Sequence, residues 1–248
     1  MALIRPAQLD RTLRDRVAGG AFFFFGDEDY LRDQAVDKVV AAYVDPATRD
    51  FNFDQPRGSD VPAETLASMI GTPPMMAEHR VVVVRDAQGL SVTARTVVEA
   101  AAKAPPPGLI LVLSAAIPSG SKAKFYDELK KHAVAVEFAP LSQDDAPGWV
   151  METGRDELGV EVDPEAARAL VGGMGVDLGM LGSELRKLAS YVQDRKRITL
   201  DDVRAVDEDG PRLRARLLEL AGTLAASAGA ADVPDPADDP AEAAALLR

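Results

Sequence analysis

Apolar residues in the first 140 positions follow two different periods, and blocks of the two kinds alternate. Short continuous apolar runs are typical of strands buried on both faces, whereas apolar residues that recur every three or four positions indicate one face of a helix. The predicted strands are residues 21–25, 51–54, 81–84, 109–114 and 133–138, and the predicted helices are residues 3–17, 31–43, 64–70, 92–104 and 123–131. Strands that alternate with helices predict an α/β domain with a mainly parallel sheet.

Past residue 140 the strand pattern disappears and only helical spacing remains. Ser142 and Thr199 each stand three residues before an aspartate, which is a capping signature for the start of a helix. The clearest amphipathic stripe of the chain lies at residues 178–192. Residues 140–206 therefore predict a small all-helical domain without strands. Residues 207–248 have room for a partial helix, followed by an acidic Ala/Pro-rich tail that we expect to be disordered.

Composition and charge restrict the function classes that remain. The 248 residues include no cysteine, which excludes disulfides and cysteine-bound zinc, and two well-separated histidines, His79 and His132, do not suggest a metal centre. No apolar run approaches the roughly 20 residues of a membrane helix, so we expect a cytoplasmic protein without membrane contact. The 40 acidic residues outnumber the 28 basic ones, and the net charge of −12 opposes binding of the isolated chain to nucleic acid.

The turn after the first predicted strand stands where a nucleotide-binding α/β domain carries its phosphate loop. That loop requires GxxxxGK[ST], but here the lysine, the second glycine and the hydroxyl are all missing. The acidic residues of the turn suit the start of a helix and repel a triphosphate. We therefore interpret the turn as a degenerate phosphate loop that caps a helix and binds no nucleotide, metal or other cofactor; its residues are Gly26, Asp27, Glu28 and Asp29.

The segment between the predicted helix 64–70 and the strand 81–84 contains two large apolar side chains on a constrained turn. Pro73 and Pro74 cannot continue a helix and stiffen the chain ahead of Met75 and Met76. Neighbouring side chains diverge, so both methionines cannot easily enter the core, and at least one is expected to be exposed. The alternative is that they merely pack at the edge of the sheet.

These features together resemble the clamp-loader branch of the AAA+ superfamily, and within it the delta-subunit family of bacterial DNA polymerase III. The resemblance is carried by GDEDYLR at 26–32, MMAEHRVVVVRD at 75–86, APLS at 139–142, PEAARAL at 164–170, LGMLGSELRKLASY at 178–191 and ITLDDV at 198–203. Their order and spacing over about residues 22–206 are specific. The resemblance implies an AAA+-like, RecA-type parallel sheet domain at residues 1–139 and a helical lid domain at 140–206.

The resemblance also implies a function without intrinsic catalysis, within the DNA polymerase III holoenzyme, which as a complex has DNA-directed DNA polymerase activity. Delta subunits grip the beta sliding clamp and open one ring interface for DNA replication, using two hydrophobic residues whose positions match Met75 and Met76. Pro74, Met69 and Ile70 complete the implied contact. Burial of two methionines offers roughly 3 to 6 kcal/mol. The other implied partners are the gamma/tau and delta prime subunits, with primed DNA reached only through the complex.

Two alternatives stay open at this point. A divergent AAA+ ATPase would bind nucleotide at the degenerate phosphate loop. A complete delta subunit continues into a helical collar domain, whereas this chain has the acidic tail after about Val206. The second alternative is therefore a truncated or frame-shifted delta homologue that no longer functions.

Overall fold

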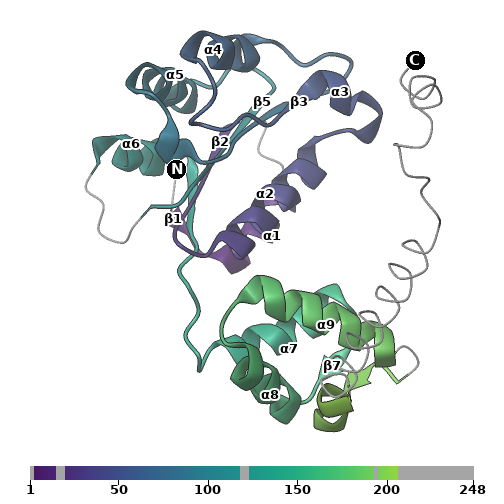
Figure 1. Ribbon diagram of the computed structural model, residues 1–248. Helices are drawn as coiled ribbons and strands as arrows, with labels where there is room; N and C mark the ends of the chain where they lie inside the picture. Colours follow the sequence, from purple (N-terminus) through teal and green to yellow (C-terminus); the bar gives the residue numbers. More distant parts are fainter. Residues whose placement is uncertain (1–2, 15–19, 118–122, 193–194, 206–248) are drawn as a thin grey trace, which may run out of the picture. The chain divides into compact units, whose positions relative to one another are not determined.

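The computed structural model describes residues 3–14, 20–117, 123–192 and 195–205 (Figure 1). The chain divides into two compact units. The first comprises Met1–Ala146 with Val176–Gly179, and the second comprises Pro147–Gly175 with the chain from Met180 onward. The domain limits predicted from the sequence, 1–139 and 140–206, stay predictions. The predicted partial helix and disordered tail at 207–248 lie outside the described residues.

A six-stranded parallel sheet forms the centre of the first unit. Its strand order is β1-β6-β2-β5-β4-β3. The strands are β1 (Leu3–Ile4), β2 (Gly20–Phe25), β3 (Phe53–Asp54), β4 (Arg80–Val84), β5 (Leu109–Ala115) and β6 (Val134–Glu137). The helices of this unit are α1 (Pro6–Arg14), α2 (Asp29–Tyr43), α3 (Arg49–Asn52), α4 (Ala63–Gly71), α5 (Val92–Lys103) and α6 (Lys124–His132), with short 3-10 turns η1 (Pro46–Thr48) and η2 (Ala87–Gly89).

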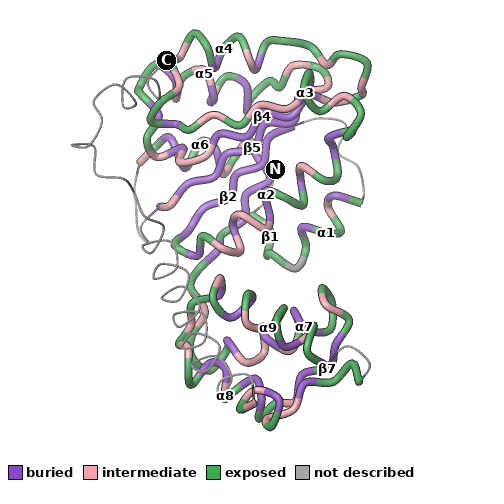
Figure 2. Tube along the Cα trace, turned by 45° about the vertical axis from the view of Figure 1, so that its right-hand side comes forward, coloured by how far each residue is buried: buried purple, intermediate pink, exposed green. Residues whose placement is uncertain are grey.

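Helices cover both faces of this sheet, which explains why its central strands are continuous apolar runs. In Figure 1, α1 and α2 lie on one face, and α4, α5 and α6 lie on the other. Alternate residues of β2 enter the two cores: Phe22 and Phe24 pack with α1 and α2, whereas Phe23 and Phe25 pack with the opposite helices. In Figure 2 the strands β2, β4 and β5 have the purple colour of buried residues. The predicted parallel α/β sheet is confirmed.

Two predicted elements of the first unit were wrong in part. The opening helix was expected from residue 3, but Leu3 and Ile4 form the edge strand β1 against β6, and helix α1 begins at Pro6. The residue before a proline is disfavoured in the helical region, so the helix cannot begin earlier. The predicted strand 51–54 is shorter than expected, because Phe51 and Asn52 end helix α3 and only Phe53–Asp54 pair with β4.

The second unit contains helices α7 (Ala146–Glu157), α8 (Pro164–Met174) and α9 (Leu178–Val192), followed by helical residues 200–205. The expectation of an all-helical unit without strands was wrong in one detail. Two short strands, β7 (Glu161–Val162) and β8 (Arg197–Ile198), form a parallel pair. Each strand has only two residues, which is too short to produce a detectable alternation. The pairing buries Val162 and Ile198 in the core of this unit.

Candidate partner-binding site

Met75 and Met76 lie in the turn that joins α4 to β4, here called the methionine turn (residues 72–79). Helix α4 ends at Gly71, and the N–H and hydroxyl of Thr72 both bind the carbonyl of Ser68. Beyond the two prolines, Met75 is 50% exposed and Met76 is 75% exposed. The prediction that at least one methionine is exposed is confirmed. The alternative, that the two merely pack at the edge of the sheet, stays a prediction.

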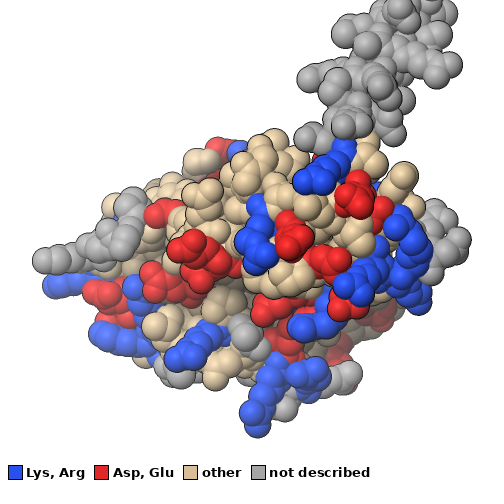
Figure 3. All heavy atoms as spheres, turned by 90° about the horizontal axis from the view of Figure 1, so that it is seen from below, with Lys and Arg blue, Asp and Glu red and all other residues tan. Residues whose placement is uncertain are grey.

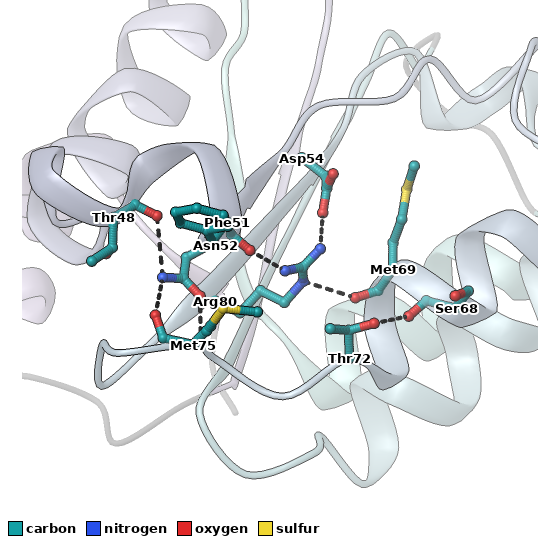
Figure 4. Close-up of polar contacts among 9 residues, drawn as sticks. All are labelled: Thr48, Phe51, Asn52, Asp54, Ser68, Met69, Thr72, Met75 and Arg80. Atoms are coloured by element: carbon teal, nitrogen blue, oxygen red, sulfur yellow. Dashed lines mark hydrogen bonds and ion pairs between the residues drawn. The ribbon is translucent and has the colours of Figure 1, made fainter.

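The side chain of Asn52, at the end of α3, binds the backbone of this turn (Figure 4). Its carboxamide oxygen accepts the N–H of Met75 at 2.8 Å, and its amide nitrogen donates to the carbonyl of Met75 at 2.8 Å. The same nitrogen donates to the carbonyl of Thr48 at 3.2 Å. Asn52 is only 1% exposed. The next residue, Met76, has a left-handed backbone with φ of 55°, which is uncommon for a residue other than glycine, asparagine or aspartate.

Arg80, the first residue of β4, binds residues of three neighbouring elements, α3, β3 and α4. Its guanidinium donates to the carbonyl of Met69 at 3.1 Å, to the carbonyl of Phe51 and to the carboxylate of Asp54, with which it forms an ion pair. Figure 4 shows these three acceptors around one guanidinium. The Arg80 side chain is 11% exposed, so this charge is compensated by partners inside the protein.

The remaining residues of the predicted contact lie deeper than the methionine pair. Ile70 is buried in the core under α4, and Met69 is partly buried against the same core. Pro74 is half-buried and lies against Gly108, where an added Cβ would stand 2.9 Å from the Pro74 Cγ atom. Gly108 has a φ of 75°, so glycine is required there by both space and conformation. Of the five predicted contact residues, Met75 and Met76 therefore present most side chain to the surface.

The degenerate phosphate loop lies at the carboxyl end of β2, as predicted, and three of the N–H groups at this turn are bound within the chain. A phosphate loop directs N–H groups at its anion. Here the N–H of Gly26 binds the carbonyl of Ala115, and the N–H of Glu28 binds the carbonyl of Phe138 at 3.1 Å. The N–H of Tyr30 binds the carboxylate of Glu28, which caps α2. These donors are not directed at a ligand.

Space at this turn is also occupied. Gly26 has a φ of 126°, and an added Cβ would stand 2.1 Å from the carbonyl oxygen of Phe138. The buried guanidinium of Arg32 donates to the carbonyl of Gly26 at 2.5 Å and to the hydroxyl of Ser114 at 3.0 Å. Burial, more than any other influence, raises the pKa of the Glu28 carboxyl. Asp27 and Asp29 are exposed. Arg32 was missed as a part of this site, although it stands in the quoted turn.

Other site classes have little support in the part of the chain that the structure describes. Within the described residues, no group of histidine, cysteine, aspartate or glutamate side chains is arranged to hold a metal ion. None of the helices seen there is long and apolar enough to cross a membrane. The face drawn in Figure 3 has lysine and arginine side chains beside aspartate and glutamate side chains. Some charged side chains of the chain pair with one another, as Arg197 and Asp163 do at 2.7 Å.

Two sequence comparisons match the delta subunit of DNA polymerase III. The family model described as DNA polymerase III, delta subunit, matches residues 22–139. DNA polymerase III subunit delta of Bacillus subtilis (strain 168) is 27% identical over 203 residues, which cover 78% of this chain and 58% of that relative. This chain therefore spans less than two thirds of the length of that relative.

A solved structure agrees with the sequence matches. The Bacillus subtilis DNA clamp loader delta protein has a TM-score of 0.66 and 23% identity, over 93% of this chain and 73% of that chain. This likeness shows the fold. The model match at residues 22–139 includes both the degenerate phosphate loop and the methionine turn. The resemblance of this chain to the delta subunit of DNA polymerase III, first seen in its sequence, is therefore confirmed.

Proposed function

We propose that this chain is a delta-type clamp-loader subunit that acts in DNA replication. It binds the beta sliding clamp through Met75 and Met76 and opens one interface of the ring. The observation that carries this proposal is the exposure of two adjacent large apolar side chains on a turn whose backbone is held by internal hydrogen bonds. Exposed apolar groups of this kind mark protein interaction sites when they are grouped.

The exposed methionine surface is large enough to matter for binding. Full burial of a methionine side chain contributes about 1.5 to 3 kcal/mol. Because Met75 is 50% and Met76 75% exposed, a partner that covers both gains about 2 to 4 kcal/mol. That range corresponds to about 30-fold to several hundred-fold in affinity. A clamp whose open form offers this contact and whose closed form does not is shifted toward the open form by the same amount.

The proposed subunit acts by binding rather than by catalysis. Its phosphate turn lacks the lysine, and the N–H groups of Gly26, Glu28 and Tyr30 bind inside the chain, which supports a member that does not hydrolyse ATP. ATP-dependent steps then fall to the gamma/tau subunits, with delta prime as a further partner. Primed DNA is contacted through the assembled complex. We place the protein in the cytoplasm, where replication of bacterial DNA takes place.

The test is binding to the beta sliding clamp of the same organism, measured by surface plasmon resonance. The variant Met75→Asp/Met76→Asp is expected to lose binding, because each aspartate would have to be desolvated in an apolar pocket. A matched control is Val92→Asp, which changes another exposed apolar residue, 81% exposed at the start of α5. The control is expected to bind like the wild type.

The outcomes separate the proposal from its alternatives. If the folded wild-type chain does not bind the clamp, the proposed function is wrong. Equal loss in the methionine variant and in Val92→Asp would mean that a general change of charge, and not the methionine turn, weakens binding. Circular dichroism of each variant establishes that it is folded before binding is measured.

A further inference from the structure

The polar contacts beneath the methionine turn suggest a role that goes beyond the proposed contact itself. Asn52 is buried, and both ends of its carboxamide bind the backbone of Met75. A side-chain amide that binds the N–H and the carbonyl of one residue mimics the pairing of two strands. It fixes the backbone of Met75 without using the Met75 side chain, which stays free at the surface.

The conformation after this contact is one that needs support. Met76 has a left-handed backbone, with φ of 55°. A non-glycine residue persists in this region only where the surrounding structure holds it. The described contacts that hold the chain one residue earlier are those of Asn52. Because the backbone of Met75 is fixed, the direction in which Met76 leaves the turn is restricted.

Arg80 connects helix α3 to helix α4 beside this turn. It binds the carbonyl of Phe51, next to Asn52 in α3, and the carbonyl of Met69, near the end of α4. Helix α3 brings Asn52 to the turn, and α4 leads into it. One guanidinium thus sets the spacing between the residue that holds the turn and the helix from which the turn departs.

We propose that Asn52 is a positioning residue that holds Met75 and Met76 in their exposed, binding-competent arrangement before a partner arrives. This inference rests on the proposed function, because it assigns a role in binding the clamp. If only a fraction of the molecules has the competent arrangement, the apparent dissociation constant rises by the inverse of that fraction. A turn that is competent one time in ten without Asn52 would bind about tenfold more weakly.

The first experiment measures the turn in the free chain and does not depend on any partner. The N–H of Met75 binds the side chain of Asn52, so its hydrogen exchange reports directly on this contact. In Asn52→Leu, the Met75 amide is expected to exchange at least about tenfold faster, while amides of β4 and β5 keep their rates. Asn52→Asp keeps an acceptor for this N–H but buries a carboxylate that faces the carbonyl oxygens of Met75 and Thr48, so its Met75 amide is expected to exchange at least as fast as in Asn52→Leu. Thr96→Val, which removes the same kind of hydroxyl bond, to the carbonyl of Val92 in α5, is the control outside the turn.

The second experiment measures binding of the full chain to the beta clamp. Asn52→Leu is expected to bind about tenfold more weakly, Asn52→Asp at least as weakly, and Thr96→Val like the wild type. A cycle with Met76→Ala distinguishes positioning from a general loss of structure. If Asn52 acts through the methionines, its replacement costs less affinity when Met76 is already alanine.

Each result supports or overturns the inference. Unchanged Met75 exchange in Asn52→Leu means that the contact does not hold the turn. Faster exchange with unchanged clamp binding means that the contact holds the turn but does not position it for binding. An equal loss of affinity with and without the Met76 side chain assigns Asn52 a purely structural role. If the wild type does not bind while its Met75 amide is protected by Asn52, the proposed function fails and takes the positioning role with it.

Discussion

Replacement of Arg80 by methionine tests whether the charge beneath the methionine turn stabilises the first unit. Methionine keeps most of the apolar stem and removes the guanidinium. Three acceptors then lose their donor: the carboxylate of Asp54 and the carbonyls of Phe51 and Met69. These acceptors belong to β3, α3 and α4, so the substitution disconnects three elements at once.

The expected loss of stability follows from how deeply each partner lies. Removal of one member of a buried ion pair typically costs 3 to 5 kcal/mol, because the other charge is left without compensation. The Asp54 side chain is 28% exposed and can be partly rehydrated, so we reduce the expectation to about 2 to 4 kcal/mol. This is a large part of the free energy of unfolding of an ordinary domain, which is about 5 to 15 kcal/mol.

The assay is urea denaturation followed by circular dichroism. With a slope of about 2 kcal/mol per molar urea, in the middle of the usual range, the midpoint of Arg80→Met is expected to fall by about 1 to 2 M. In a double-mutant cycle with Asp54→Asn, the second substitution is expected to cost less once Arg80 is gone. A loss below about 1 kcal/mol, or strict additivity with Asp54→Asn, would refute the argument that Arg80 compensates a buried carboxylate.

Three further predictions concern other parts of the chain. Gly26→Ala is expected to lower the free energy of unfolding by about 2 kcal/mol or more, seen as a lower urea midpoint, because the new Cβ would stand 2.1 Å from a carbonyl oxygen; an unchanged midpoint would contradict the close approach. Millimolar MgATP is expected to leave the thermal midpoint unchanged, because the phosphate turn lacks the lysine and three of its N–H groups are used internally; a rise would indicate nucleotide binding. Burial raises the pKa of Asp202, but hydrogen bonds from Thr199 and Arg195 lower it more. The stability from this lowered pKa is present above the unfolded pKa and is lost as the pH falls through the folded value. Asp202→Asn is therefore expected to cost about 1 to 2 kcal/mol at pH 7, with the difference from wild type shrinking in acid in parallel denaturation curves.

The central sheet was predictable because its strands are buried on both faces. A parallel strand with helices on either side has no polar face, so 21–25, 81–84 and 109–114 are visible as continuous apolar runs. Strands of two residues carry no such signal. Both β1 and the β7–β8 pair form only because distant segments offer them a partner, so local periodicity could not predict them.

The exposed methionines were also predictable, but the contacts that hold them were not. Adjacent large side chains after two prolines can be identified locally. The bonds of Asn52 to Met75 and of Arg80 to Phe51 join residues 23 and 29 positions apart, and no local pattern announces them. The available signal was indirect: an asparagine between two phenylalanines, and an arginine at the start of an otherwise apolar strand. Polar residues in such positions need buried partners.

The phosphate turn and the methionine turn, the two candidate sites of the first unit, differ in which groups are left for a ligand. This difference favours the methionine turn as a binding site. At the phosphate turn, the N–H groups of Gly26, Glu28 and Tyr30 are bound inside the chain and are not offered to an anion. At the methionine turn, the backbone is likewise bound by Asn52, but the apolar side chains are left exposed. A turn with bound backbone groups loses little freedom when a partner covers it, so most of the apolar gain is available for binding.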